Sequence, residues 1–283
     1  MSLLPVPDLG LAASVIPADS AEKSASSVVL ADSAEKSASS VLPAPPADRA
    51  LVLVGHGSRD PRSSATMRAL ADRVARRWAG PVTAAFLDFD PPTVPGALRG
   101  LADRPGGVPI VVPALLTRAY HGRVDLPEVL ASVPVPTQLA AVLGPADPGD
   151  PVDPLLVSGL LRRVSEVESP FDGLALLAAG TSSAAARSTV EHVATVLAQR
   201  LHVPCAVGYA SASGPRPAEA IARLRALGCA RVVGCAYFLA PGRLYEAAVA
   251  GAMGAGAIAV AAPLGAASEL VDLVLARATA VPA

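Results

Sequence analysis

The stretch ALVLVGHGSRDP at residues 50–61 decides the fold. Its first part is a short run of Leu and Val, typical of a strand buried on both faces of a sheet. Glycines at positions 55 and 57 then turn the chain, and Pro61 is suited to the first turn of a helix. The stretch therefore predicts a strand–turn–helix unit with His56 at the carboxyl end of the strand.

The same alternation continues to the end of the chain. Apolar runs predict further strands at 82–88, 108–116, 137–144, 173–182, 203–210, 230–239 and 257–265. Helical patterns predict helices at 63–79, 93–104, 123–132, 153–168, 184–201, 216–227, 243–253 and 268–279. Strands that alternate with helices form parallel sheets covered by helices on both faces, so the fold class is α/β.

The two halves of this series resemble each other. Setting Gly55 against Gly180, and residues 111–123 against 232–244, places His56 opposite Thr181 and His121 opposite Gly242. We therefore expect two similar domains, at 49–146 and 147–283, of which the second is degenerate. Two such domains facing each other would form a cleft at the carboxyl ends of their strands.

The N-terminal segment differs from this body. It holds the copy ADSAEKSASSV at 18–28 and again at 31–41, is rich in Ser, Ala and acidic residues, and contains no aromatic residue. Such a composition cannot bury enough apolar surface to fold, so residues 1–48 are predicted to be a disordered tail.

Composition also excludes several classes of function. Residues 49–145 carry eleven Arg against seven acids, too few and too scattered for a nucleic-acid surface but suited to a small anionic substrate. The three cysteines form no CxxC pair, and no signal peptide is visible, so we expect a cytoplasmic protein. The uncharged stretch between Glu246 and Glu269 contains Pro263 and several glycines, and is predicted to be a helix end, a turn and a strand rather than a membrane span.

Two histidines are the candidate catalytic residues. His56 and His121 each follow a predicted strand, and the carboxyl ends of parallel strands share one edge of the sheet. A neutral imidazole binds divalent metals and also accepts a proton near neutral pH. The other two, His192 within a helix and His202 after it, are interpreted as surface or helix-end residues.

Three motifs carry a resemblance to a known family. GHGSRDP at 55–61, FLDFDPPTVPGAL at 86–98 and VVPALLTRAYHGRVDLP at 111–127 resemble successive signatures of the sirohydrochlorin chelatase and cobaltochelatase family. In the second half, LAAGTSSAAAR at 177–187 and YFLAPGRL at 237–244 are similar to the second domain of that family. The resemblance covers residues 50–280.

The resemblance implies a chelatase that inserts Fe2+, Co2+ or Ni2+ into a tetrapyrrole without a nucleotide, in siroheme or cobalamin synthesis. It assigns metal binding and the uptake of pyrrole protons to His56 and His121. A carboxylate that assists in some members corresponds to Asp88, taken as a third metal ligand, or to Asp90; Asp stands here where Glu is more usual. Because the chain contains both domain copies, we expect a monomer.

The carboxylates of sirohydrochlorin would need cations and hydrogen-bond donors. Guanidinium groups suit carboxylates geometrically, and three arginines flank the two histidines. The expected substrate-binding residues are Ser58, Arg59, Arg118 and Arg123.

Two other functions are compatible with parts of the sequence. A phosphatase with a catalytic histidine has an Arg-His-Gly motif, but Gly55 precedes His56 here. A carrier that binds a tetrapyrrole or metal without turnover would keep the same binding residues. Turnover in an anaerobic assay distinguishes the carrier from the enzyme.

Overall fold

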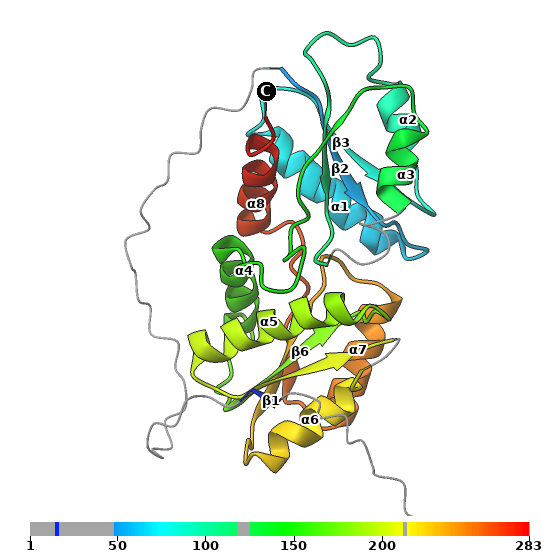
Figure 1. The fold of residues 1–283 in the computed structure, drawn as a ribbon. Helices are drawn as coiled ribbons and strands as arrows, with labels where there is room; N and C mark the ends of the chain where they lie inside the picture. The colour runs from blue at the N-terminus through cyan, green and yellow to red at the C-terminus, as the bar shows by residue number, and fades with distance from the viewer. Residues whose placement is uncertain (1–14, 17–47, 118–124, 212–213, 283) are drawn as a thin grey trace, which may run out of the picture.

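The protein consists of two parallel sheets stacked end to end (Figure 1). The computed structural model describes residues 15–16, 48–117, 125–211 and 214–282. In the first sheet the strand order is β3-β2-β4-β5, with bounds β2 Leu51–Gly55, β3 Val82–Phe86, β4 Ile110–Pro113 and β5 Gln138–Leu139. The parallel strands of the second sheet have the order β7-β6-β8-β9, with bounds β6 Gly173–Ala178, β7 Cys205–Tyr209, β8 Val232–Tyr237 and β9 Ala259–Val260, and the short strand β1 Val15–Ile16 is added antiparallel beside β7. The equal order confirms the α/β class and the two similar units.

The helices lie on both faces of each sheet. The expected positions are confirmed for all eight: α1 Pro61–Ala75, α2 Val94–Arg99, α3 Leu126–Ala131, α4 Pro154–Ser165, α5 Ala184–Leu201, α6 Pro217–Ala226, α7 Arg243–Gly254 and α8 Ser268–Thr279. Side-chain caps explain several of their starts, since Asp60, Thr93, Asp153 and Ser183 each accept a hydrogen bond from a backbone N–H of the first turn. The edge strands β5 and β9 have only two residues each, shorter than expected.

The last helix of each repeat packs on the sheet of the other repeat. The last helix, α8, belongs to the second half of the sequence but packs against α1 and β4 of the first sheet (Figure 1). In turn α4, which follows β5, packs against β8 and α5 of the second sheet. Arg77, just after α1, pairs with Asp272 of α8, and the Arg277 guanidinium donates to the carbonyl of Val142. The packing therefore crosses the sequence boundary predicted at 146.

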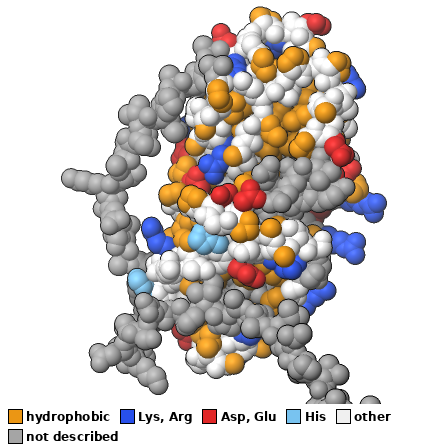
Figure 2. Space-filling view, viewed as in Figure 1, with side chains coloured by type: hydrophobic (Ala, Val, Ile, Leu, Met, Phe, Trp, Pro, Cys, Tyr) orange, Lys and Arg blue, Asp and Glu red, His pale blue; other side chains and the backbone are white. Residues whose placement is uncertain are grey.

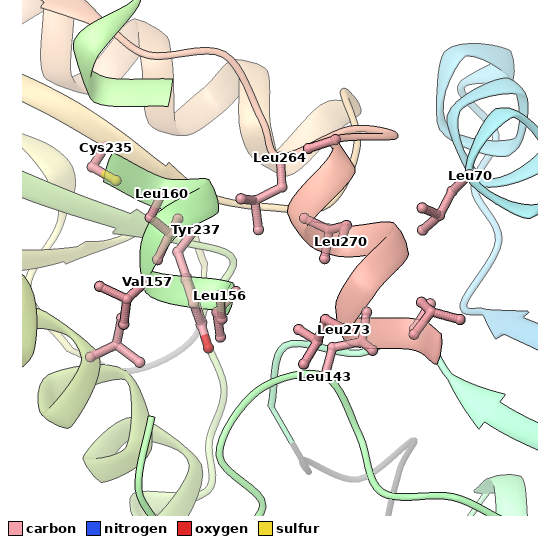
Figure 3. Packing of buried hydrophobic residues seen from close by; sticks show 14 of the residues in the cluster. Leu70, Leu143, Leu156, Val157, Leu160, Cys235, Tyr237, Leu264, Leu270 and Leu273 are labelled. Atoms are coloured by element: carbon pink, nitrogen blue, oxygen red, sulfur yellow. The ribbon is translucent and has the colours of Figure 1, made fainter. Parts of the chain in front are cut away.

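The exchange produces a hydrophobic core that both halves share. Leu70 of α1, Leu160 of α4 and Leu273 of α8 belong to one buried cluster that continues to Cys235 and Tyr237 of β8 (Figure 3). Separate clusters lie beneath α2 and α3 on the outer face of the first sheet, and beneath α6 and α7 on the outer face of the second. The two sheets are thus joined through buried apolar contacts.

The segment predicted to be a disordered tail contributes one short strand. Residues Val15–Ile16 form β1, which pairs antiparallel with Cys205 and Ala206 at the edge of the second sheet. The tandem copies at 18–28 and 31–41 lie outside the described residues.

The uncharged stretch before Glu269 forms the end of α7, a glycine turn and β9, as predicted. Within the described part of the chain, none of the helices has the length and apolar character needed to cross a bilayer. On the face shown in Figure 2, apolar side chains are widespread, and basic side chains lie in several places, some of them beside acidic ones, without forming one continuous surface.

Candidate active site

His56 lies where β2 ends at the carboxyl edge of the first sheet, as predicted. Its side chain is half-buried, and its Nδ1 lies 3.2 Å from the carbonyl oxygen of Gly57. A carbonyl can only accept a hydrogen bond, so in this contact Nδ1 donates, and in the neutral imidazole the lone pair is then on Nε2. Nε2 is therefore the nitrogen that can bind a metal or accept a proton.

Gly57 sets the direction in which the chain leaves the strand. Its φ is +91°, and a Cβ at this position would lie 1.8 Å from the carbonyl oxygen of Asp88. Only glycine allows that approach. The backbone carbonyl of His56 also accepts from the N–H of Asp88 at 2.8 Å, so the loops after β2 and β3 are bonded together beside the imidazole.

A cavity of about 260 Å³ lies between the carboxyl ends of the two sheets. His56 and residues 114–117 line it from the first half, and residues 178–181 and 237–239 line it from the second. The Tyr237 hydroxyl donates to the carbonyl of Leu116 at 2.8 Å and so bonds the two walls together. Most lining side chains are apolar, which suits the flat faces of an organic ring system.

Phe89 lies beside His56 and was not predicted from the sequence. Its ring stacks on the imidazole at 6.5 Å between centroids with an interplanar angle of 14°, and the Arg59 guanidinium lies 5.3 Å from the centroid of Phe89. Phe89 is 60% exposed and has a φ of +64°, an uncommon conformation for a bulky residue. Nothing in the sequence signals this conformation, because Phe is not a residue that favours it.

A second cavity, of about 820 Å³, is lined in part by the loop after β2 and by Phe89. Residues 57–61 and Phe89 line it from the first half, and Arg243 and Glu246 of α7 line it from the second. Arg62 pairs with both Asp60, at 2.7 Å, and Glu246, at 2.9 Å, and so connects α1 to α7. Its hydrogen bond holds the pKa of Asp60 below the usual range.

The predicted site residues fall into four groups. His56 lines the first cavity, whereas Ser58 and Arg59 line the second. Asp88 is exposed and lines neither, and Asp90 accepts from the backbone N–H of Ser58 at 3.0 Å, so its carboxylate supports the loop. His121, Arg118 and Arg123 lie outside the described residues.

The described part of the chain holds no group of three or more His, Cys, Asp or Glu side chains arranged to bind a metal. The predicted ligand set includes His121, so this finding covers only His56 and Asp88 of that set. His192 lies within α5, and His202 ends that helix with a φ of +55°. Neither lines the first cavity.

The structure corrects the alignment of the two halves by two residues. Gly180, with a φ of +99°, repeats the geometry of Gly57, since a Cβ on it would meet the carbonyl oxygen of Ser211 at 2.0 Å. Ser58 Oγ accepts from Asp60 N, and Thr181 Oγ1 accepts from Ser183 N in the same way. Thr181 therefore corresponds to Ser58.

By the same register, Ala179 corresponds to His56, and its carbonyl accepts from Ser211 N as that of His56 accepts from Asp88 N. The prediction that Thr181 replaces His56 is wrong, because Gly55 is the last residue of β2, whereas Gly57 and Gly180 both lie after their strands and both have a positive φ. The pairing of His121 with Gly242 lies outside the described residues. The second half still offers no imidazole at the position of His56.

Comparisons with known proteins identify the family of this chain. The model of the CbiX family matches the chain twice, over residues 50–166 and 173–281, one match for each unit of the fold. The chain belongs to the CbiX family. The two matches also confirm the duplication seen in the sheets.

Among CbiX-related proteins, the sirohydrochlorin cobaltochelatase of Methanocaldococcus jannaschii is 36% identical over 85 residues, which cover 30% of this chain and 59% of the relative. The matched part thus spans just under three fifths of that relative. The sirohydrochlorin ferrochelatase of Bacillus subtilis is 25% identical over 183 residues, covering 62% of this chain and 68% of the relative.

Solved structures show the same fold. SirB from Bacillus subtilis with Fe3+ matches with a TM-score of 0.69 at 20% identity, over 81% of this chain and 94% of that one. The structure of CbiX described as the terminal enzyme of siroheme biosynthesis in denitrifying bacteria matches with a TM-score of 0.54 at 20% identity, over 81% and 96%. The CbiX fold therefore extends over nearly the whole described body.

Proposed function

We propose that this protein inserts Fe2+ or Co2+ into sirohydrochlorin or a related tetrapyrrole, without a nucleotide, as a monomer. The observation that supports this most is the position of His56, whose imidazole lines an apolar cavity between the two sheets of a CbiX-family fold. The relatives named cobaltochelatase and ferrochelatase indicate the class of substrate.

The chemistry follows from what metal insertion requires. Two pyrrole N–H protons must leave the macrocycle as the metal enters, so the site needs a metal ligand and a proton acceptor. His56 Nε2 has the lone pair for either role. We assign the other role to His121. Asp88 is exposed and lines neither cavity. We therefore give its carboxylate a supporting role, in which it receives the metal at the entrance to the cleft.

The apolar lining of the first cavity would serve the macrocycle faces. Cations in the second cavity, with Arg59 among them, would serve the carboxylates at the rim of the macrocycle. Metal and tetrapyrrole both enter as substrates in this proposal. Imidazole ligands accept either Fe2+ or Co2+. The preference between the two ions is therefore measured by supplying each in the assay below.

The test is anaerobic metal insertion into sirohydrochlorin, followed by the absorption spectrum, with Fe2+ and Co2+ supplied separately. His56→Ala should lower the rate at least about tenfold, because proton transfer by a positioned side chain contributes on the order of 100-fold or more. His192→Ala, which alters a histidine of α5, is the matched control and should keep the wild-type rate. Equal rates for His56→Ala and wild type would refute the role of His56, and wild-type binding without turnover would favour the carrier.

A further inference from the structure

The second half of the chain supplies a cation to the cleft. Arg243 is the first residue of α7, and it lines the second cavity together with Arg59 of the first half. Both side chains are exposed to the space between the halves. The cavity is therefore not a feature of the histidine-bearing half alone.

Both acids that line this cavity already pair with one other arginine, Arg62. Asp60 and Glu246 both pair with Arg62, at 2.7 Å and 2.9 Å. By contrast, the described residues offer no acidic partner to Arg59 or Arg243, and the contact found for Arg59 is the face of Phe89. Two guanidinium groups thus remain available for an anion from outside the chain.

The neighbouring backbone fits the same ligand. The residue before α7 is Gly242, which has no side chain to cap the helix, and a Cβ on Gly242 would lie 3.9 Å from Ser58 Oγ. The start of α7 is thus brought against the loop that carries Ser58 and Arg59. The N-terminal end of a helix favours negative charge, so its position reinforces the two arginines.

We propose that Arg59 and Arg243 form a carboxylate-binding subsite shared by the two halves, which holds acidic side groups of the tetrapyrrole while its ring lies in the cavity beside His56. This inference rests on the proposed function. It makes Arg243 a residue of substrate recognition, with no part in metal transfer. The degenerate half then contributes directly to specificity for a polycarboxylated macrocycle.

Binding without metal provides the test. Metal-free sirohydrochlorin is titrated anaerobically into the full chain, and its absorption and fluorescence give Kd. Arg243→Ala should raise Kd at least about fivefold, Arg243→Lys should raise it less, and Arg243→Glu should raise it more. The matched control is Arg200→Ala, which removes an exposed arginine from the end of α5 and should leave Kd unchanged.

A second ligand separates charge from shape. The methyl ester of sirohydrochlorin lacks the anionic carboxylates, so its Kd should be the same for Arg243→Ala and wild type. In turnover assays, Arg243→Ala should raise KM with little change in kcat, as expected when binding is lost equally from ground and transition states.

The outcomes distinguish the two proposals. If wild type inserts metal while Arg243→Ala binds sirohydrochlorin as Arg200→Ala does, the subsite is refuted and the chelatase function stands. If Kd depends on Arg243 but wild type never inserts metal, the chelatase function fails and the anion subsite stands. A loss of affinity for the ester equal to that for sirohydrochlorin would show that Arg243 acts by shape, and would also refute the subsite.

Discussion

At the scale of single residues, the site depends on the backbone at Gly57 as much as on the imidazole beside it. Gly57 lets the loop after β2 pass within bonding distance of the loop after β3, where Asp88 N reaches the carbonyl of His56 at 2.8 Å. That contact holds Phe89 against the imidazole. The orientation of His56 is therefore fixed from the backbone side.

Replacing Gly57 by Ala should destabilise the protein by more than about 3 kcal/mol, because a positive φ costs roughly 1 kcal/mol and the new Cβ would also overlap a carbonyl oxygen. That Cβ would lie 1.8 Å from Asp88 O. Gly149→Ala is the matched control, since Gly149 has a φ of +94° with nothing within 4 Å. It should cost only about 1 kcal/mol. Urea unfolding of both variants measures the difference, and equal costs would contradict the steric argument.

The sequence was sufficient to place His56 at the carboxyl end of β2, because a histidine between glycines after an apolar run has a recognisable pattern. The sequence did not indicate that Phe89 and Arg243 lie beside the cleft. Phe89 joins the site through an unusual φ, and Arg243 joins it through the packing of the second half against the first. Neither property leaves a local signal in the sequence. The alignment of the two halves was wrong by two residues for a similar reason. The positive φ of Gly57 distinguishes it from Gly55, whereas in the sequence both are simply glycines.

At the scale of elements, periodicity located the helices well but could not show which sheet each one covers. The predicted bounds 184–201 and 268–279 match α5 and α8 at both ends. An amphipathic pattern shows that a helix has a buried face, and carries no information about its partner. The exchange of α8 onto the first sheet therefore had to come from the structure.

Because α8 covers the first sheet, Leu273→Ala should destabilise the first half as well as the second. Leu273 is fully buried, and a Leu to Ala change in a core costs about 2–5 kcal/mol. The single Trp of the chain, Trp78, lies buried in the first half with its Nε1 donating to the carbonyl of Arg49. Its fluorescence therefore reports unfolding of the first half, and circular dichroism reports both.

We expect Leu273→Ala to lower the urea midpoint equally by fluorescence and by circular dichroism. Leu227→Ala is the control, because Leu227 is 50% exposed and lies next to α6 of the second half. It should change stability by less than about 0.5 kcal/mol. A Trp78 transition that stays at the wild-type midpoint in Leu273→Ala would show that α8 does not stabilise the first sheet.

At the scale of the whole molecule, the cleft depends on a rigid connection between the two sheets. The cluster through α1, α4 and α8 provides it from within, and the pair of Arg62 with Glu246 adds a contact at the surface. Exposed ion pairs contribute about 0–1 kcal/mol each, so the buried cluster dominates. The walls that carry His56 and Arg243 are thus held together mainly by apolar packing.

Two cysteines buried in this cluster predict a loss of stability at alkaline pH. Burial raises the pKa of the Cys205 thiol to about 12, and burial, reinforced by Cys205, also raises the pKa of Cys235. In the unfolded chain a thiol titrates near 8.5, so above that pH the unfolded state binds fewer protons than the folded state. Stability should therefore be constant below about pH 8 and fall as the pH rises toward the folded pKa values.

Between pH 8.5 and 9.5 each of these thiols should cost about 1 kcal/mol, or about 2 kcal/mol for the pair. The measurement is the free energy of unfolding in urea across pH 7–10 with a reductant present, so that disulfides cannot form (a range roughly centred on the pKa of a free thiol). The double variant Cys205→Ala/Cys235→Ala will start from a lower stability because it loses core volume, but its curve should be flatter by that amount. Burial also raises the pKa values of Tyr209 and Tyr237. These tyrosines lower the stability only at a higher pH than the thiols do. An equally steep curve in the double variant would show that the two thiols are not the groups responsible.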